Sequence, residues 1–154
     1  MTRRWRAIGA IFVTAVVIAA GAWVLVRQPW SSSSTSAASV AEGKALYQTN
    51  CASCHGTRGE GQPDWKTKKP DGLYPAPPHD SSGHTWHHAD GLLFRIVREG
   101  GQVAGPPGFK SGMPAFGGTL SDAQIRATLE YIKTFWGPTE RKSQADQSLR
   151  DPYR

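Results

Sequence analysis

"CASCH", residues 51–55, contains the only two cysteines of this 154-residue chain, and a histidine directly follows the second one. Two thiols separated by two residues occur in redox-active disulfides, in zinc sites, and where a prosthetic group is bonded covalently to the chain. The residues on either side of this pentapeptide indicate which of the three applies.

The residues before the pentapeptide predict a helix that leads into it. Ser39 and Glu42 have the spacing of a capping box at a helix N-terminus. Gly43, Tyr47 and Cys51 then recur every four residues, which places them on one helical face. We therefore expect the last turn of this helix to carry the first cysteine.

Two further helices are predicted towards the C-terminus. Residues 90–99 begin with Asp90 as an N-cap, carry apolar side chains at helical spacing and end at two glycines. Ser121 and Gln124 form a second capping box, and the apolar stripe that follows is expected to end at Gly137. This stripe consists of Ile125, Leu129, Ile132 and Trp136.

The fold class predicted from these patterns is all-α, with three or more short helices and long glycine- and proline-rich loops. No convincing alternating strand pattern occurs. Such long loops are unusual for a domain of this size if apolar packing alone stabilises it. A large planar cofactor would supply apolar surface, and CASCH is where it could be attached.

The three interpretations of CASCH make different demands on the chain. A redox-active pair usually lies in a βαβ unit, which is missing here. A structural zinc site needs four ligands, and no second cysteine pair exists, although histidines could complete one. C-x-x-C-H is typical of covalent haem c attachment, with thioether bonds to Cys51 and Cys54 and with His55 bound to iron. One haem c per chain is therefore favoured, and zinc stays as an alternative.

Met113 is the candidate for the second axial ligand of the iron. A methionine sulfur takes this position in many haem electron carriers. Apart from Met1 it is the only methionine, and it lies in a glycine-rich loop, FKSGMPAFGGTLS, before the last predicted helix. The alternative is a methionine that fills a gap in the core.

These motifs together resemble the class I cytochromes c over residues 39–137. GKALYQTNCASCHG is similar to the first helix and haem motif of that family, and GMPAFGGTLSDAQIRATLEYIKTFW is similar to its methionine loop and C-terminal helix. The resemblance implies an electron carrier rather than an enzyme, folded around one covalently bound haem.

The resemblance also implies two specific contacts. A glycine and an aromatic residue on the first helix of the family cross the C-terminal helix. Gly43 and Tyr47 should therefore meet the region that contains Thr128, Leu129, Tyr131 and Ile132. A proline carbonyl in the family accepts a hydrogen bond from the imidazole that binds iron, and Pro77 or Pro78 is the candidate here.

Residues 77–91, PPHDSSGHTWHHADG, contain four of the five histidines, namely His79, His84, His87 and His88. If this stretch is helical, the last three share a face and could bind copper or zinc. They could instead, with Trp86, shelter a haem edge, hydrogen-bond to the haem propionates or cap the next helix. The third possibility is that one of these histidines binds the iron as an alternative ligand. The sequence does not choose among these roles.

The N-terminal residues predict attachment to a membrane. Residues 7–26 form a run of twenty residues without a charge, which is long enough to cross a bilayer as one helix. The preceding Arg3, Arg4 and Arg6 favour a cytoplasmic N-terminus. A cleaved signal peptide is the alternative, because residues 20–22 resemble a cleavage site.

Four segments follow from these patterns. We expect an uncleaved transmembrane anchor over 1–27, a serine-rich flexible linker over 28–38, a cytochrome c domain over 39–137 and a polar disordered tail over 138–154. The expected location is the bacterial inner (cytoplasmic) membrane, crossed once, with the haem domain in the periplasm or outside.

The charge pattern argues against binding to nucleic acid. Four of the 18 basic residues flank the predicted anchor, which leaves 14 basic and 12 acidic residues and no concentrated basic patch. We expect a membrane-tethered carrier that relays single electrons between respiratory or periplasmic redox proteins through a His/Met-ligated haem. The alternatives are a haem-based ligand sensor and a dedicated electron-input subunit of an oxidase or dehydrogenase complex. The sequence names neither the donor nor the acceptor.

Overall fold

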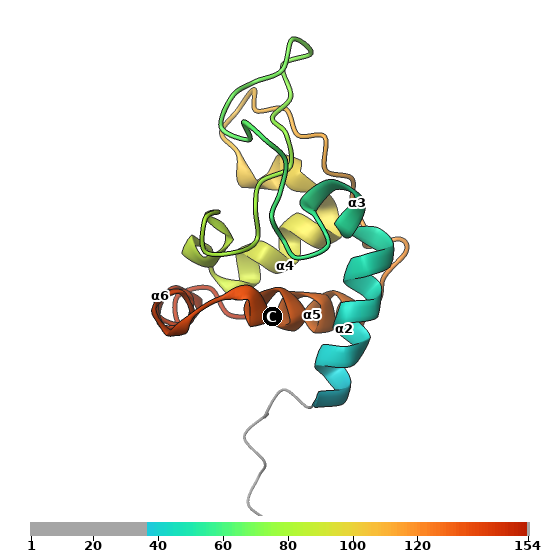
Figure 1. The fold of residues 1–154 in the computed structure, drawn as a ribbon, viewed down its shortest axis with the longest axis vertical. Coiled ribbons are helices and arrows are strands. Elements are labelled where there is room, and N and C mark those ends of the chain that lie inside the picture. Colours follow the sequence, from blue (N-terminus) through green and yellow to red (C-terminus); the bar gives the residue numbers. More distant parts are fainter. Residues whose placement is uncertain (1–36, 154) are drawn as a thin grey trace, which may run out of the picture. The chain divides into compact units, whose positions relative to one another are not determined.

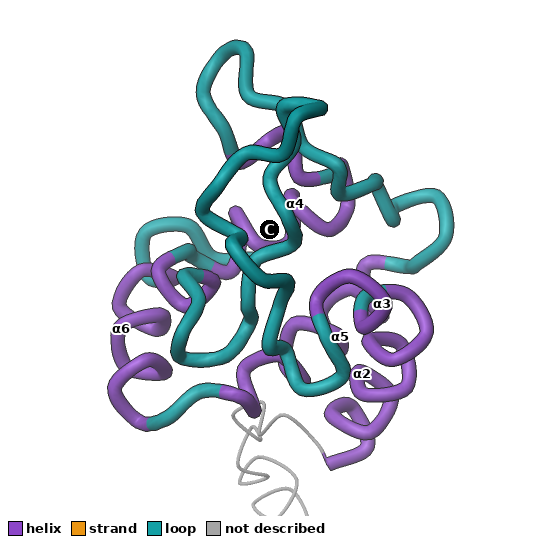
Figure 2. The backbone as a smooth tube through the Cα atoms, turned by 45° about the horizontal axis from the view of Figure 1, so that its top comes forward, coloured by secondary structure: helices purple, strands orange, loops and turns teal. Residues whose placement is uncertain are grey.

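The computed structural model describes residues 37–153, and this part of the chain is helical with no strand. Figures 1 and 2 show the helices and the long loops that connect α3 with α4 and α4 with α5. The α-helices are α2 (Ala37–Asn50), α3 (Ala52–His55), α4 (Asp90–Glu99), α5 (Asp122–Ile132) and α6 (Pro138–Ser148). Short 3₁₀ turns occur at η1 (Thr85–His87), η2 (Gly101–Ala104) and η3 (Lys133–Phe135). The predicted all-α class is confirmed for these residues.

The predicted anchor over 1–27 and most of the predicted linker lie outside the described residues. Helix α2 begins at Ala37, so the last two residues of the predicted linker are helical. None of the helices between residues 37 and 153 is both long and apolar enough to span a bilayer.

Helices α2 and α5 cross each other at very short range (Figure 1). Gly43 makes this approach possible, because a Cβ atom there would overlap the carbonyl of Ala127 and lie 3.1 Å from the backbone nitrogen of Thr128. Tyr47, one turn later, is fully buried, and its ring lies 5.4 Å from that of Tyr131. The predicted crossing of the first and last helices of the domain is confirmed.

The apolar core lies where α2, α4 and α5 meet. Helix α5 supplies Ile125, Leu129 and Ile132 of the predicted stripe, Trp136 follows η3, and α4 adds a second face. The buried members of the core are Tyr47, Leu93, Phe94, Val97, Leu120, Ile125, Leu129, Ile132 and Trp136. Truncating one of the larger aliphatic side chains to alanine would cost about 2–5 kcal/mol of stability.

The structure confirms one predicted capping box and corrects two other predicted caps. Ser121 accepts a hydrogen bond from the backbone of Gln124, and the Gln124 side chain accepts one from the backbone of Ser121. Helix α2 already begins at Ala37, so Ser39 is not its N-cap. Helix α4 has the predicted bounds, but Ala89 is its N-cap and the Asp90 carboxylate binds elsewhere.

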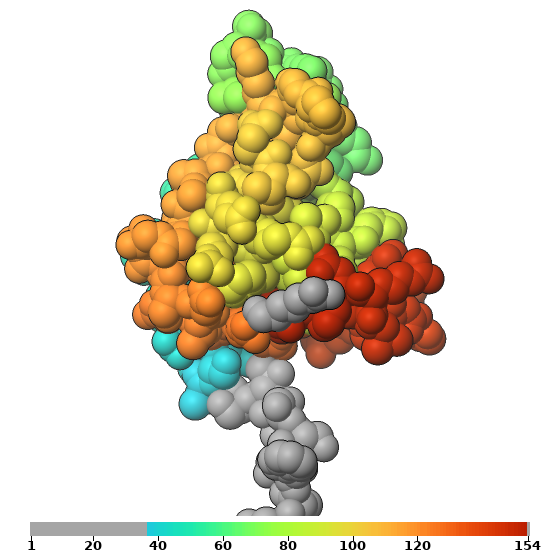
Figure 3. Space-filling view, turned by 180° about the vertical axis from the view of Figure 1, so that it is seen from behind, coloured from blue at the N-terminus to red at the C-terminus, as the bar shows by residue number. Residues whose placement is uncertain are grey.

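The prediction of a disordered C-terminal tail is wrong for the described residues. Helix α5 already ends at Ile132 and η3 at Phe135, so the Gly-Pro pair after Trp136 does not end the predicted helix; instead Gly137 is the N-cap of α6 and Pro138 is its first residue. Figure 3 shows α4 and the segment of α6 side by side on one face of the molecule. The extended residues after α6 pack on α4 through an ion pair of Arg95 with Asp151, with an N–O distance of 2.7 Å.

Polar contacts hold α6 in place, which explains why hydrophobic periodicity did not reveal it. Gln144 is 3% exposed, and its amide nitrogen lies 2.7 Å from Asp90 Oδ1 and 3.4 Å from the carbonyl oxygen of His88. Tyr153 packs edge-on against Phe94, with ring centroids 6.1 Å apart. A sequence without an apolar stripe can therefore still form an ordered helix when a buried amide finds its acceptors.

Candidate haem-binding site

The two cysteines lie at the junction of α2 and α3. The Cys51 backbone nitrogen donates to the Tyr47 carbonyl at 2.9 Å, and the His55 nitrogen donates to the Cys51 carbonyl at the same distance. The chain thus passes from one helix into the other almost without a break. Both thiols are free; Cys51 is half-buried and Cys54 is exposed. They are available for two bonds to an external group.

His55 is buried, and among residues 37–153 only its Nδ1 has a hydrogen-bond partner. The residue is 7% exposed, and Nδ1 lies 2.9 Å from the carbonyl oxygen of Pro77. A carbonyl can only accept a hydrogen bond, so Nδ1 carries the proton and Nε2 keeps its lone pair. Burial lowers the pKa of His55, which favours this neutral form. The ring is therefore prepared to bind a metal through Nε2.

Of the two predicted prolines, Pro77 is the one that accepts from His55. The Pro78 carbonyl instead accepts a hydrogen bond from the hydroxyl of Thr85 at 3.3 Å. An imidazole that ligates a metal usually donates its other N–H to an oxygen acceptor, which fixes the ring and raises its basicity. The contact between His55 and Pro77 has this form.

Met113 is held by its backbone beside η2. Its N–H donates to Ser111 Oγ at 3.1 Å, and its carbonyl accepts from the Gly101 N–H at 3.1 Å. The side chain is half-buried and packs against the core cluster. Cys51 and Trp86 pack against the same cluster. Ligation of iron by Met113 stays a prediction.

The donor groups of this chain fit a haem. Two free thiols, one neutral imidazole and one thioether are the groups that bind haem c in proteins. In addition, the indole N–H of Trp86 is buried and has no hydrogen-bond partner among residues 37–153. A buried N–H without an acceptor is unfavourable, and a haem brings two propionate carboxylates that could accept it.

Residues 40–136 match the family profile of cytochrome c. The chain belongs to the cytochrome c family. It is 32% identical over 103 residues to cytochrome c6 from Synechococcus sp., and the alignment covers 67% of this chain and 76% of that protein. No solved structure matches it at a significant level. Membership of the cytochrome c family implies covalently bound haem c and haem-based electron transfer.

The histidine-rich segment of this cytochrome does not form the predicted three-ligand face. Before α4 begins at Asp90, only residues 85–87 of this segment are helical, as a single 3₁₀ turn. The His84 ring stacks on Trp65 with centroids 5.2 Å apart, whereas His87 stacks on Trp86 at 3.6 Å. Within residues 37–153, no group of three or more His, Cys, Asp or Glu side chains is placed to hold a metal ion. Among these residues, neither the accessory copper or zinc site on the histidines nor a closed zinc site at CASCH finds a ligand set.

His79 has a different position from the other three histidines. Its ring stacks on that of His55, with centroids 4.1 Å apart and an angle of 18° between the planes. Packing of protein around the ring, together with the nearby His55, lowers the pKa of His79 well below its usual value. The sequence placed His79 in the histidine-rich segment and left its role open.

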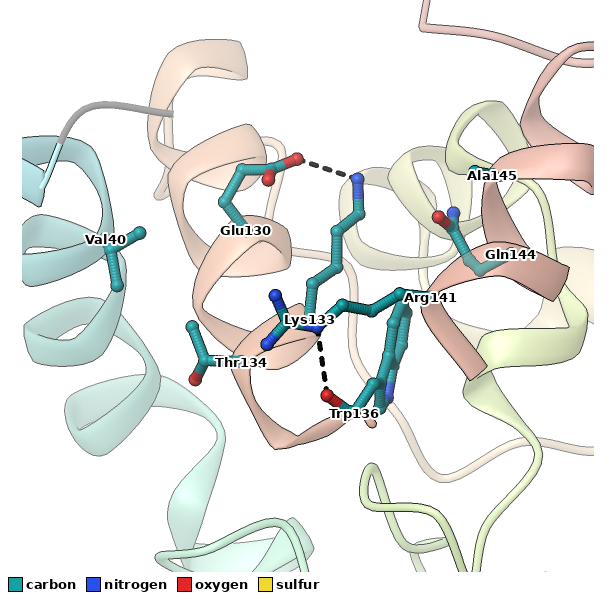
Figure 4. Close-up of a pocket in the computed structure, with 8 residues that line it drawn as sticks. All are labelled: Val40, Glu130, Lys133, Thr134, Trp136, Arg141, Gln144 and Ala145. Atoms are coloured by element: carbon teal, nitrogen blue, oxygen red, sulfur yellow. Dashed lines mark hydrogen bonds and ion pairs between the residues drawn. The ribbon is translucent and has the colours of Figure 1, made fainter. Parts of the chain in front are cut away.

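A hollow lies between the end of α5 and α6, and none of the residues that line it belongs to CASCH (Figure 4). It has a volume of about 300 Å³ and is lined by Val40, Glu130, Lys133, Thr134, Trp136, Arg141, Gln144 and Ala145. Its cations already have partners: Lys133 pairs with Glu130 at 2.7 Å, and Arg141 donates to the Trp136 carbonyl at 2.9 Å. Of these two contacts, that of Arg141 attaches the first part of α6 to Trp136, and we assign no ligand to the hollow.

Proposed function

We propose that this chain is a one-electron carrier in which Cys51 and Cys54 hold a single haem c by thioether bonds while His55 and Met113 bind its iron. The observation that supports this most strongly is the 2.9 Å contact between His55 Nδ1 and the Pro77 carbonyl. This contact leaves Nε2 as the free ligand atom of a buried ring that directly follows the second thiol.

Each residue has a distinct task in this proposal. The bound haem supplies one-electron redox chemistry. Pro77 keeps the His55 ring in one orientation and makes it a stronger donor. Met113 contributes a sulfur atom, which raises the reduction potential relative to a second nitrogen ligand. Since both ligands come from an ordered, packed chain, little rearrangement accompanies electron transfer.

The test of the ligand set is the optical spectrum of the full chain matured with haem, in ferric and ferrous forms. We expect the weak near-infrared band of sulfur-bound ferric haem in the wild type and its loss in Met113→Ala. The control is Val103→Ala, since Val103 is an exposed residue of the same interhelical segment. A wild-type spectrum without this band would contradict Met113 as ligand.

We also propose that residues 7–26 anchor the carrier in the bacterial inner membrane, with the haem domain on the periplasmic side. The uncharged run and the arginines before it support this part of the proposal. An anchor would raise the local concentration of the haem domain near membrane-bound redox partners. The test compares the full chain with a chain that lacks residues 1–27, both washed in alkaline buffer; only the full chain should stay in the membrane pellet. Recovery of both in the supernatant would contradict the anchor.

A further inference from the structure

One face of the His55 ring is covered by a second imidazole. The His79 ring lies 4.1 Å away and is nearly parallel, with an interplanar angle of 18°. The loop that contains His79 also provides the Pro77 carbonyl, which accepts from His55 Nδ1 at 2.9 Å. A single short stretch of loop therefore contacts the His55 ring both at its edge and on its face.

His79 is itself held from several directions. Its Nδ1 lies 2.9 Å from Thr85 Oγ1, and that hydroxyl also reaches the Pro78 carbonyl at 3.3 Å. Its backbone N–H donates to Gly59 at 2.7 Å, and its carbonyl accepts from the indole of Trp136 at 2.7 Å. These hydrogen bonds fix both the backbone and the ring of His79. They therefore hold the His79 ring in its stacked position in addition to the van der Waals packing around it.

The stacking geometry excludes one role for His79. Two axial ligands of one iron bind on opposite faces of the haem plane, so their rings cannot stack face to face. The His79 ring, 4.1 Å from that of His55, lies beside it. His79 is therefore not the partner ligand of His55 across the iron, which removes it from the candidates for an alternative sixth ligand.

The hydrogen bond to Pro77 alone does not fix every motion of His55. A single contact at Nδ1 restrains that edge of the ring, but the ring can still tilt and swing about the contact. A flat ring stacked on one face opposes these motions, since aromatic rings have preferred stacked separations and lose contact when they tilt. The orientation and basicity of a metal-bound imidazole tune the metal.

We propose that His79 is a positioning residue that fixes the orientation of the His55 imidazole and thereby contributes to the reduction equilibrium of the iron that His55 binds. This inference rests on the proposed function, because it requires His55 to be the iron ligand. It assigns a role to a histidine that acts through another residue and does not itself touch the iron.

The test uses the full chain matured with haem and compares His79→Leu with His79→Phe. Leucine fills part of the space but provides no flat face, whereas phenylalanine keeps the ring and loses the bond to Thr85. In His79→Leu we expect a broadened ferric electron paramagnetic resonance spectrum and a shift of the reduction equilibrium constant by roughly threefold towards ferrous iron, because a less well aligned imidazole donates less to ferric iron. His79→Phe should restore most of the wild-type spectrum.

Two further variants keep the test decisive. His84→Leu makes the same change at a histidine that stacks on Trp65 instead, so its spectrum and equilibrium should stay unchanged. Thr85→Val removes the hydroxyl beside His79 Nδ1 without touching His55, and it should produce a smaller change of the same sign even if His79→Leu fails to fold.

The results separate this inference from the proposed function. Covalent haem content and the near-infrared band of the wild type report on Cys51, Cys54, His55 and Met113, so their absence would overturn the proposed function itself. If both are present, unchanged spectra and equilibria in the folded His79→Leu and Thr85→Val variants would overturn the positioning role. An equal shift in His84→Leu would overturn it as well.

Discussion

Replacing Gly43 by alanine should destabilise the protein, although alanine is the better helix former. A Cβ at this position would overlap the Ala127 carbonyl and lie 3.1 Å from the backbone nitrogen of Thr128. These are backbone atoms in the middle of α5, so they cannot rotate away as the end of a side chain could. Helices α2 and α5 would have to separate.

The expected size follows from two opposing effects. Overpacking a close contact costs up to about 3 kcal/mol. Alanine in place of glycine inside a helix stabilises the helix by about 1 kcal/mol, because alanine has the higher helix propensity. The net loss for Gly43→Ala should therefore be about 2 kcal/mol, which lowers the urea midpoint by roughly 1 M for a domain of this size.

The assay is urea unfolding of the haem-loaded chain, followed by far-ultraviolet circular dichroism. Ala45→Gly is the matched control, because Ala45 is exposed on the same helix and the change reports the helix-propensity cost alone. The control should lose about 1 kcal/mol. A higher midpoint for Gly43→Ala than for the wild type would show that the two helices do not approach as closely as described.

Three other substitutions and conditions have defined outcomes. Tyr47→Phe removes the 2.9 Å hydrogen bond from a buried hydroxyl to the Gly56 carbonyl and should cost about 1 kcal/mol of unfolding free energy. Gln144→Ala removes the buried amide that holds α6 and should cost about 2 kcal/mol and speed amide exchange in α6, measured by hydrogen exchange. Burial lowers the pKa of His84 and of His88, so the folded chain binds fewer protons than the unfolded chain. The free energy of unfolding should therefore decrease as the pH falls below about 6.5, and the decrease should be shallower in His84→Gln.

The Gln144→Ala prediction has a matched control in the same helix. Gln147→Ala changes a second glutamine of α6 whose side chain is only half-buried, and it should leave amide exchange in the helix nearly unchanged. Exchange in α6 that is already fast in the wild type would contradict the packed helix. If the free energy of unfolding does not decrease as the pH falls from about 6.5 into the mildly acidic range, His84 and His88 are not buried in their neutral forms as described. An unchanged midpoint in Tyr47→Phe would mean that water replaces the lost partner.

The sequence predicted those parts of the fold that depend on local signals. The capping box at Ser121 and the apolar stripe of α5 are short-range patterns, and both are present in the structure. The bounds of α4 were predicted correctly, because the apolar spacing and the glycine after Glu99 mark them directly. Asp90 was misassigned as its N-cap, since its carboxylate pairs with Lys133 and Gln144 from distant segments.

The contacts that were missed connect segments far apart in the sequence. Gln144 reaches His88 and Asp90 across more than fifty residues, and no periodic pattern encodes such a pair. The stack of His79 on His55 joins an irregular loop to a short helix, where neither helical nor strand spacing applies. The sequence therefore indicated the cysteines, the helices around them and a proline acceptor for His55, while the choice of Pro77 and the stack with His79 required the structure.

Carbon monoxide binding by the ferrous, haem-loaded full chain tests the central claim most directly. If His55 and Met113 both bind the iron, no coordination position is vacant. The wild type should therefore bind carbon monoxide slowly or not at all. Met113→Ala should bind it rapidly, while Val103→Ala should behave as the wild type. Rapid binding by the wild type, unchanged in Met113→Ala, would contradict the carrier and favour a haem protein that senses a small ligand.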